Sequence, residues 1–176
     1  GYERWAKVHN LKQMAQTVNY LREHGLLDYA ELEKKAADAT ARFNGLSEKI
    51  KSAEKRMAEI AALKTHIINY SKTREIYAAY RKAGYSKKFL AEHESEILLH
   101  KAAKKAFDEL NLTKLPTVKS LQTEFAELLT QKKAAYAQYR TARDDMRELL
   151  IHKANVERIL REDAPKTEKQ AAYERK

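Results

Sequence analysis

The sequence predicts an all-α fold, an elongated antiparallel coiled-coil hairpin of two long helices with a short helix at its tip and an N-terminal helix. Four glycines and two prolines among 176 residues leave few places to turn, whereas strong helix formers dominate the rest. The 34% charged content indicates helices that are solvated along one side. Two long segments repeat apolar residues at alternating spacings of four and three, which is the heptad pattern of a coiled coil.

The first helix is expected over residues 3–24, because Gly25 follows it as a stop signal. One stripe of this helix is mainly apolar at helical spacing and is expected to face the rest of the molecule. The stripe consists of Trp5, Val8, Leu11, Ala15, Val18 and Leu21.

A second helix is predicted over 28–83, about 55 residues or roughly 80 Å long. Asp28 is a good N-cap, and Glu31 three residues later resembles a capping box. Its heptad seam is unbroken through Leu32, Ala36, Ala39, Phe43, Leu46, Ile50, Ala53, Met57 and Ile60. Beyond Ile60 the stripe continues, after a local change in spacing, through Leu63, Ile67, Tyr70, Thr73, Tyr77 and Tyr80.

The matching seam lies over 117–162, in the second half of the chain. It runs through Leu121, Phe125, Leu128, Lys132, Ala135, Tyr139, Ala142, Met146, Leu149, Lys153, Val156 and Leu160. The two lysines are compatible with it, because a lysine stem can lie along an apolar seam while the ammonium reaches water. The two seams are expected to pack against each other within the chain, and an intermolecular coiled coil is the alternative.

The segment 84–116 between the two long helices is predicted to form the tip. Gly84 ends one helix, Ser86 can cap a third helix over 86–110, and Pro116 precedes the last one. The run "EHESE" at 92–96 is polar on every face and is expected to break the third helix. Residues 1–162 then make one helical domain, and 163–176, which contain Pro165, are expected to be a frayed tail or linker.

The positive charge indicates a polyanionic partner and points to the tip. The net charge is +10 and the pI about 9.6. Residues 70–120 hold eleven Lys or Arg against six Asp or Glu. Phosphate contacts from basic side chains and base stacking on an aromatic ring are what DNA binding needs. The candidate DNA-binding residues are Lys72, Arg74, Arg81, Lys82, Tyr85, Lys87 and Lys88.

Two neighbouring groups of residues have a plainer interpretation. Tyr70, Tyr77 and Tyr80 continue the heptad, so core packing is favoured over base stacking for these three rings. The second basic cluster, in "KAAKK" at 101–105, is interpreted as a solvated helix face.

No catalytic, metal or cofactor site is predicted. The chain has no glycine-rich phosphate loop, no G-x-S-x-G motif and no cysteine. His93, Glu96 and His100 share a helical face, but a matching Glu-x-x-His pair on another helix is lacking. The fragment is therefore expected to be no enzyme. The absence of cysteine and of a long apolar run favours a cytoplasmic protein without a membrane partner.

Three stretches resemble a known family: "WAKVHNLKQMAQTVNYL" (5–21), "AYRKAGYSKKFLAEHESEILLHKAAKKAF" (79–107) and "LPTVKSLQTEFAELLTQKKAAYAQYR" (115–140). They are similar to the helical C-terminal region of relaxases, the mobilization nucleases of conjugative transposons in Gram-positive bacteria. The resemblance implies a longer parent whose N-terminal domain nicks DNA with a histidine cluster and a tyrosine. This sequence contains neither, so no catalytic residue is carried over.

The resemblance also implies partners. These are DNA, single-stranded or close to the transfer origin and bound with low sequence preference, and the coupling protein or other relaxosome subunits. The chain itself is expected to be a monomer or weak dimer. The alternative is a purely structural coiled-coil spacer, or a protein-interaction module, without DNA binding.

Overall fold

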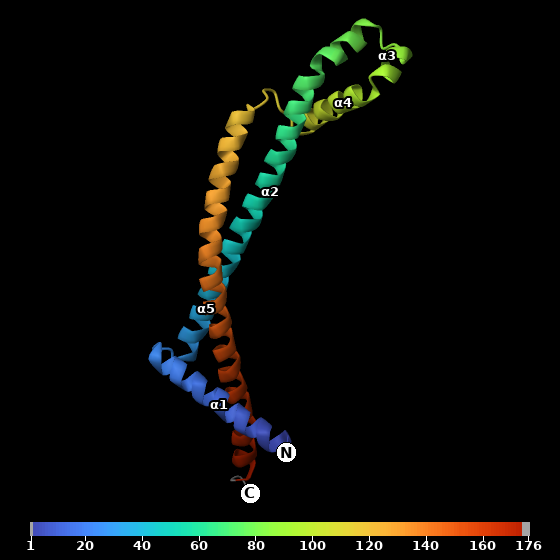
Figure 1. Ribbon diagram of the computed structural model, residues 1–176. Coiled ribbons are helices and arrows are strands. Elements are labelled where there is room, and N and C mark those ends of the chain that lie inside the picture. Colours follow the sequence, from blue (N-terminus) through green and yellow to red (C-terminus); the bar gives the residue numbers. More distant parts are fainter. Residues whose placement is uncertain (1, 174–176) are drawn as a thin grey trace. The chain divides into compact units, whose positions relative to one another are not determined.

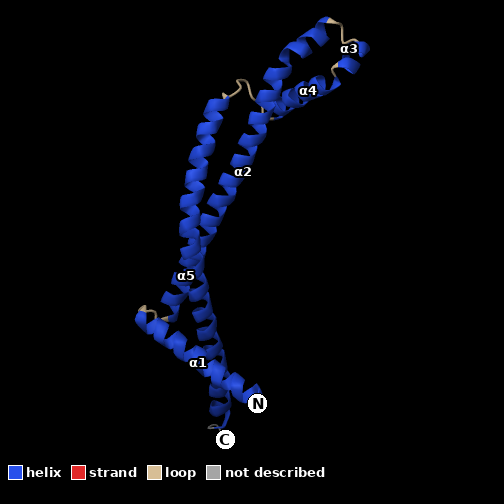
Figure 2. Ribbon diagram, in the orientation of Figure 1, coloured by secondary structure: helices blue, strands red, loops and turns tan. Residues whose placement is uncertain are grey.

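The computed structural model describes the backbone of residues 2–173 and the side-chain surroundings of residues 2–162. Over this range the chain forms helices and no strand (Figure 2). The elements are α1 (Tyr2–Glu23), α2 (Tyr29–Lys82), α3 (Lys87–Glu92), α4 (Glu94–Glu109) and α5 (Val118–Tyr173), labelled in Figure 1. The predicted all-α class, with two long helices packed against each other, is confirmed.

The chain divides into two compact units, and each is described by itself below. Unit 1 combines residues 1–48 with residues 135–176, and unit 2 is the continuous stretch 49–134. Both long helices pass through both units, so each unit contains one segment of α2 and one of α5. Within each unit these two segments run in opposite directions (Figure 1).

Local signals set the helix ends. The α1 helix closes at Gly25, whose φ of 66° is the left-handed conformation that glycine tolerates best. There the Leu26 amide donates to the Leu21 carbonyl at 2.7 Å, and the Gly25 amide donates to the Arg22 carbonyl at 3.3 Å. The next helix starts at a side-chain cap, because the Ala30 amide donates to Asp28 Oδ1 at 2.7 Å.

The core of unit 1 joins α1, α2 and α5. Its buried members are Leu21, Leu26, Leu32, Ala36 and Leu149, with Tyr20, Ala39 and Val156 packed against them. The α2 and α5 contributions lie on the predicted heptad seams, which are buried or half-buried from Leu32 to Ile60 and from Leu121 to Val156.

The predicted contact stripe of α1 is wrong over most of its length. Trp5 and Leu11 are 59% and 66% exposed, and of the predicted stripe residues only Leu21 is buried. The buried face instead centres on Thr17, which bonds to α5: its Oγ1 lies 2.9 Å from His152 Nδ1 and accepts from Asn155 Nδ2 at 3.0 Å. Polar contacts therefore orient α1, and the apolar period does not.

The core of unit 2 contains a third helix that packs along the two long ones. It is built from Ile60 and Leu63 of α2, Ala103 and Phe107 of α4, and Leu121 of α5. The α2 stripe beyond Leu63 therefore faces α4, as the ring contact between Tyr70 and Phe107 at 5.6 Å shows. The expected break of the tip helix occurs at His93, which separates α3 from α4.

Charged side chains bridge the two long helices of unit 2 beside the apolar seam. Lys132, which interrupts the α5 seam, places its Nζ 2.8 Å from Glu54 of α2. Arg56 of α2 donates to both carboxylate oxygens of Glu124 on α5, at 2.7 and 3.1 Å. The seam thus tolerates lysine as the sequence predicts, because the ammonium leaves the apolar contact to meet a carboxylate.

The α5 helix continues to Tyr173, past residue 162 where the sequence predicts the helical domain to end. Residues 174–176, and the side chains of 163–173, lie outside the described part of the chain. The frayed tail or linker over 163–176 therefore stays a prediction.

Candidate nucleic-acid interface

The seven candidate residues lie at the end of α2, in the following turn and on α3, all within unit 2. We call this set the basic tip: Lys72, Arg74, Arg81, Lys82, Tyr85, Lys87 and Lys88. All seven side chains are exposed to solvent. Exposed ammonium and guanidinium groups are available to a polyanion without desolvating a buried site.

The basic tip is not one continuous face. Arg74 and Arg81 are seven residues apart and therefore share a side of α2, about 10 Å from each other along the axis. Lys72 is two residues from Arg74 and points to nearly the opposite side of the helix. A straight polyanion that contacts both arginines would miss Lys72, so the predicted set splits into two groups.

Tyr85 is presented by a strained turn. Its φ of 60° follows Gly84 at 62°, and a bulky residue rarely adopts this left-handed conformation. The turn is held by the Tyr85 amide, which donates to the Tyr80 carbonyl at 3.1 Å. The Tyr85 ring stays 54% exposed and meets the buried Tyr80 edge-on at 5.2 Å. Backbone strain of this kind is often kept where a side chain has a function.

The other three tyrosines belong to the core, which confirms the plainer interpretation. Tyr80 is 5% exposed, and Tyr70 and Tyr77 are half-buried. The rings of Tyr70 and Tyr77 stack on His100 of α4 at 4.6 and 4.2 Å. These rings attach α4 to α2 and are not free to stack on a base.

His100 is a structural residue of this junction. Its ring is 4% exposed, and its Nδ1 lies 3.0 Å from Thr73 Oγ1. The Thr73 hydroxyl donates to the Asn69 carbonyl at 2.7 Å, so the oxygen of Thr73 accepts and His100 carries its proton on Nδ1. Burial, with a smaller contribution from Lys104, lowers the pKa of His100 below its usual value. The ring is therefore held neutral.

Lys101 adjoins the basic tip, which the sequence interpretation missed. Its Nζ lies 5.8 Å from the centroid of the Tyr80 ring, because α4 packs back along α2. The signal was present in the stripe Ile97, His100, Ala103 and Phe107, which is the buried side of α4. Lys105, by contrast, makes only an exposed ion pair with Glu109 at 3.8 Å.

The positive charge is concentrated in unit 2. Its residues 49–134 include 18 Lys or Arg against 10 Asp or Glu, an excess of eight of the chain's +10. The remaining residues, those of unit 1, have an excess of two. Attraction to a polyanion is therefore a property of unit 2, although it extends beyond the tip.

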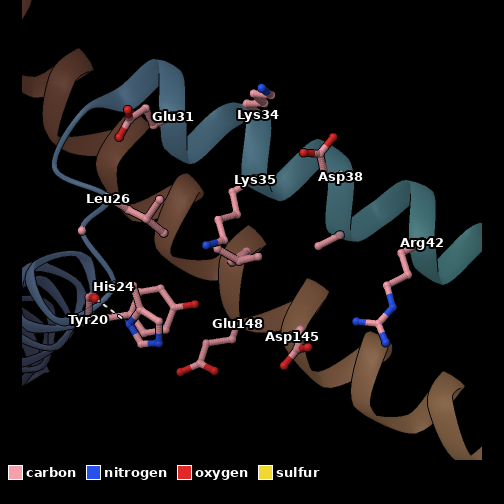
Figure 3. A pocket seen from close by; sticks show the side chains of 13 residues that line it. Tyr20, His24, Leu26, Glu31, Lys34, Lys35, Asp38, Arg42, Asp145 and Glu148 are labelled. Carbon is pink, nitrogen blue, oxygen red and sulfur yellow. Dashed lines mark hydrogen bonds between the residues drawn. The ribbon is translucent and has the colours of Figure 1, made fainter.

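A separate open cleft of about 780 Å³ lies in unit 1 between α1, α2 and α5. Figure 3 shows Lys35 and Arg42 extending from α2, while α5 contributes Asp145 and Glu148. On the α1 side, His24 Nδ1 lies 2.8 Å from the carbonyl oxygen of Tyr20. Charges of both signs line this cleft, so it selects neither an anion nor a cation.

The structure offers no metal site among the residues it describes. No group of three or more His, Asp or Glu side chains in that range is arranged to hold a metal ion. Of the three residues considered from the sequence, His93 stacks on Phe89 at 4.6 Å, and His100 is buried in the α2–α4 junction. Within the same range, no helix is long and apolar enough to cross a membrane.

Comparison with known proteins adds no relative. No protein-family model matches the chain, and neither a curated protein nor a solved structure shows significant similarity to it.

Proposed function

We propose that this chain is the non-catalytic helical C-terminal region of a conjugative relaxase and that it binds DNA through the basic tip. Two things support the proposal. One is the resemblance of the three stretches quoted above to that region of relaxases. The other, which carries the DNA-binding part, is the set of six exposed cations around an exposed, strained Tyr85.

The chemistry of the basic tip favours contact with the sugar–phosphate backbone. Lysine and arginine side chains on a convex helix end neutralise phosphates and release condensed counterions, which is a sequence-independent source of affinity. The same residues have no neighbouring Asn or Gln side chain on α3 with which to read a base edge. Binding with little sequence preference follows.

The setting of this activity is also proposed. The chain would work in the cytoplasm of the donor cell as part of a DNA-processing complex, with the coupling protein or another relaxosome subunit as a further partner. The long helices would then connect the DNA contact to the catalytic domain of the parent protein.

Charge reversal of the tip tests the proposal. Lys87→Glu with Lys88→Glu should weaken binding of a fluorescent duplex oligonucleotide, measured by anisotropy, because two cations that neutralise phosphates become anions. The matched control is Lys34→Glu with Lys35→Glu, which changes the net charge equally but lies in unit 1. Circular dichroism should show unchanged helicity for both variants, since all four lysines are exposed. Equal losses of affinity in the two variants would refute a local site.

A further inference from the structure

One face of α5 in unit 1 is rich in arginine. Tyr136, Arg140, Arg143, Arg147 and Leu150 follow at spacings of four, three, four and three, which places all five on one side of the helix. Arg143 is half-buried and the other four are exposed. The Arg140 guanidinium lies 5.2 Å from the centroid of the Tyr136 ring, which fixes both side chains on this face.

The acidic residues of the same stretch are mostly on another side. Asp145 and Glu148 line the cleft that α5 shares with α1, shown in Figure 3. Asp144 is the exception, since its Oδ1 accepts from Arg143 Nε at 3.1 Å. Arg140 and Arg147 have no carboxylate within ion-pair distance among the described residues, so this face has a local surplus of positive charge.

An uncharged groove of about 430 Å³ lies beside this face, between α2 and α5 of unit 1. The α2 wall consists of small or short side chains, Ala36, Ala37, Thr40, Ala41 and Asn44, and Leu150 of the arginine face stands on the α5 wall. The only charged lining residues are Glu33 and Lys153. The Lys153 ammonium is already paired, 3.2 Å from Glu157.

We propose that this groove receives an amphipathic α-helix from a partner protein, with acidic residues flanking its apolar side. The apolar side packs on Ala37, Ala41 and Leu150, where short side chains let a helix approach closely. The flanking carboxylates pair with Arg143 and Arg147, because a guanidinium binds a carboxylate through two parallel hydrogen bonds.

A protein helix fits this surface better than a nucleic acid does. An uncharged wall beside the arginines buries apolar side chains but gives phosphates nothing to bind. Exposed tyrosine and arginine are also the residues that contribute most at protein interfaces. Unit 1 has a charge excess of only two, so it lacks the general attraction for DNA that unit 2 has.

The test uses the full chain and two synthetic helical peptides. One carries a leucine stripe flanked by glutamates, and the other has lysines in place of those glutamates. The glutamate peptide should bind in a fluorescence anisotropy titration, and the lysine peptide should not. Arg143→Glu with Arg147→Glu should weaken binding of the glutamate peptide by roughly tenfold or more. Lys34→Glu with Lys35→Glu changes the net charge equally within unit 1 and should leave the affinity unaltered.

A neutral variant separates docking in the groove from diffuse attraction. Ala41→Gln places a longer side chain in the groove without changing charge or helix propensity much, and Ala41 is exposed, so folding is kept. It should weaken the glutamate peptide and leave duplex DNA binding intact. The proposal is overturned if Ala41→Gln has no effect, if neither peptide binds, or if the arginine reversal impairs DNA binding while the peptide does not bind.

Discussion

At the scale of single residues, the described part of the chain contains two histidine–threonine pairs that attach one helix to another. In unit 2, His100 of α4 bonds to Thr73 of α2 between two tyrosine rings. In unit 1, His152 of α5 bonds to Thr17 of α1 and stacks on Tyr20 at 4.1 Å. Each histidine is a polar group that became tolerable in a helix interface because its ring is stacked and hydrogen-bonded.

These two histidines predict a dependence of stability on pH. Burial lowers the pKa of both His100 and His152 below the unfolded value of about 6.5. The unfolded chain therefore binds more protons as the pH falls below about 6.5, and the free energy of unfolding should decrease there. Urea titrations followed by circular dichroism, from about pH 8 to about pH 5, measure it. A double variant, His100→Gln with His152→Gln, should show a flatter profile; an unchanged slope would contradict the assignment.

Tyr85 allows a second prediction at this scale. Its exposed ring can stack on an unpaired base, which a duplex does not offer. Tyr85→Ala should therefore weaken a single-stranded oligonucleotide by about 1 to 3 kcal/mol and a duplex by less. The substitution keeps all six cations of the basic tip, so its effect is distinct from that of charge. Equal losses for the two oligonucleotides would show that the ring serves only the turn.

At the scale of elements, the docking of α4 on α2 depends on a single buried stripe. Ile97 is fully buried, and its neighbour Leu98 is 57% exposed. Ile97→Ala should lower the free energy of unfolding by about 2 to 5 kcal/mol, because it removes apolar contacts and leaves a cavity. Leu98→Ala is the matched control and should change it by less than about 0.5 kcal/mol. Denaturant titration distinguishes them, and similar costs would mean that α4 does not pack as described.

Two glycines in α2 and at its end should respond in opposite directions to the same substitution. A Cβ added at Gly45 meets no atom within 4 Å, and the residue has no positive φ. Gly45→Ala should stabilise the helix by about 1 kcal/mol, because glycine has the larger entropy loss on folding. Gly84→Ala should destabilise it by about 1 kcal/mol, since its φ of 62° is unfavourable for a side chain. Thermal melts test both, and a loss of stability in Gly45→Ala would indicate a contact at that position.

At the scale of the whole molecule, the uneven charge predicts how DNA binding responds to salt. If about four cations of the basic tip neutralise phosphates, log affinity should fall against log salt with a slope near −4 for a duplex and near −3 for a single strand. Anisotropy titrations at several salt concentrations provide both slopes. Slopes twice as steep would show that the other cations of unit 2 take part and that the tip is only one portion of a diffuse surface.

The sequence by itself determined the all-α class, the helix ends and the burial of the two seams. The predicted range 28–83 for the second helix differs by one residue at each end from α2, because the capping Asp28 and the left-handed Gly84 act locally. The exposure of the basic tip was likewise predictable. Even the opposite directions of Lys72 and Arg74 follow from helix geometry alone.

Only the tertiary structure decided which stripe meets which partner. The period of α1 predicts contact through Trp5 and Leu11, but hydrogen bonds from Thr17 to α5 turn this helix so that both are exposed. Likewise, the α2 stripe beyond Leu63 packs on α4, which brings Lys101 to the ring of Tyr80. Periodicity shows that a helix face needs cover. The choice of cover depends on contacts between segments far apart in the chain, which no local pattern specifies.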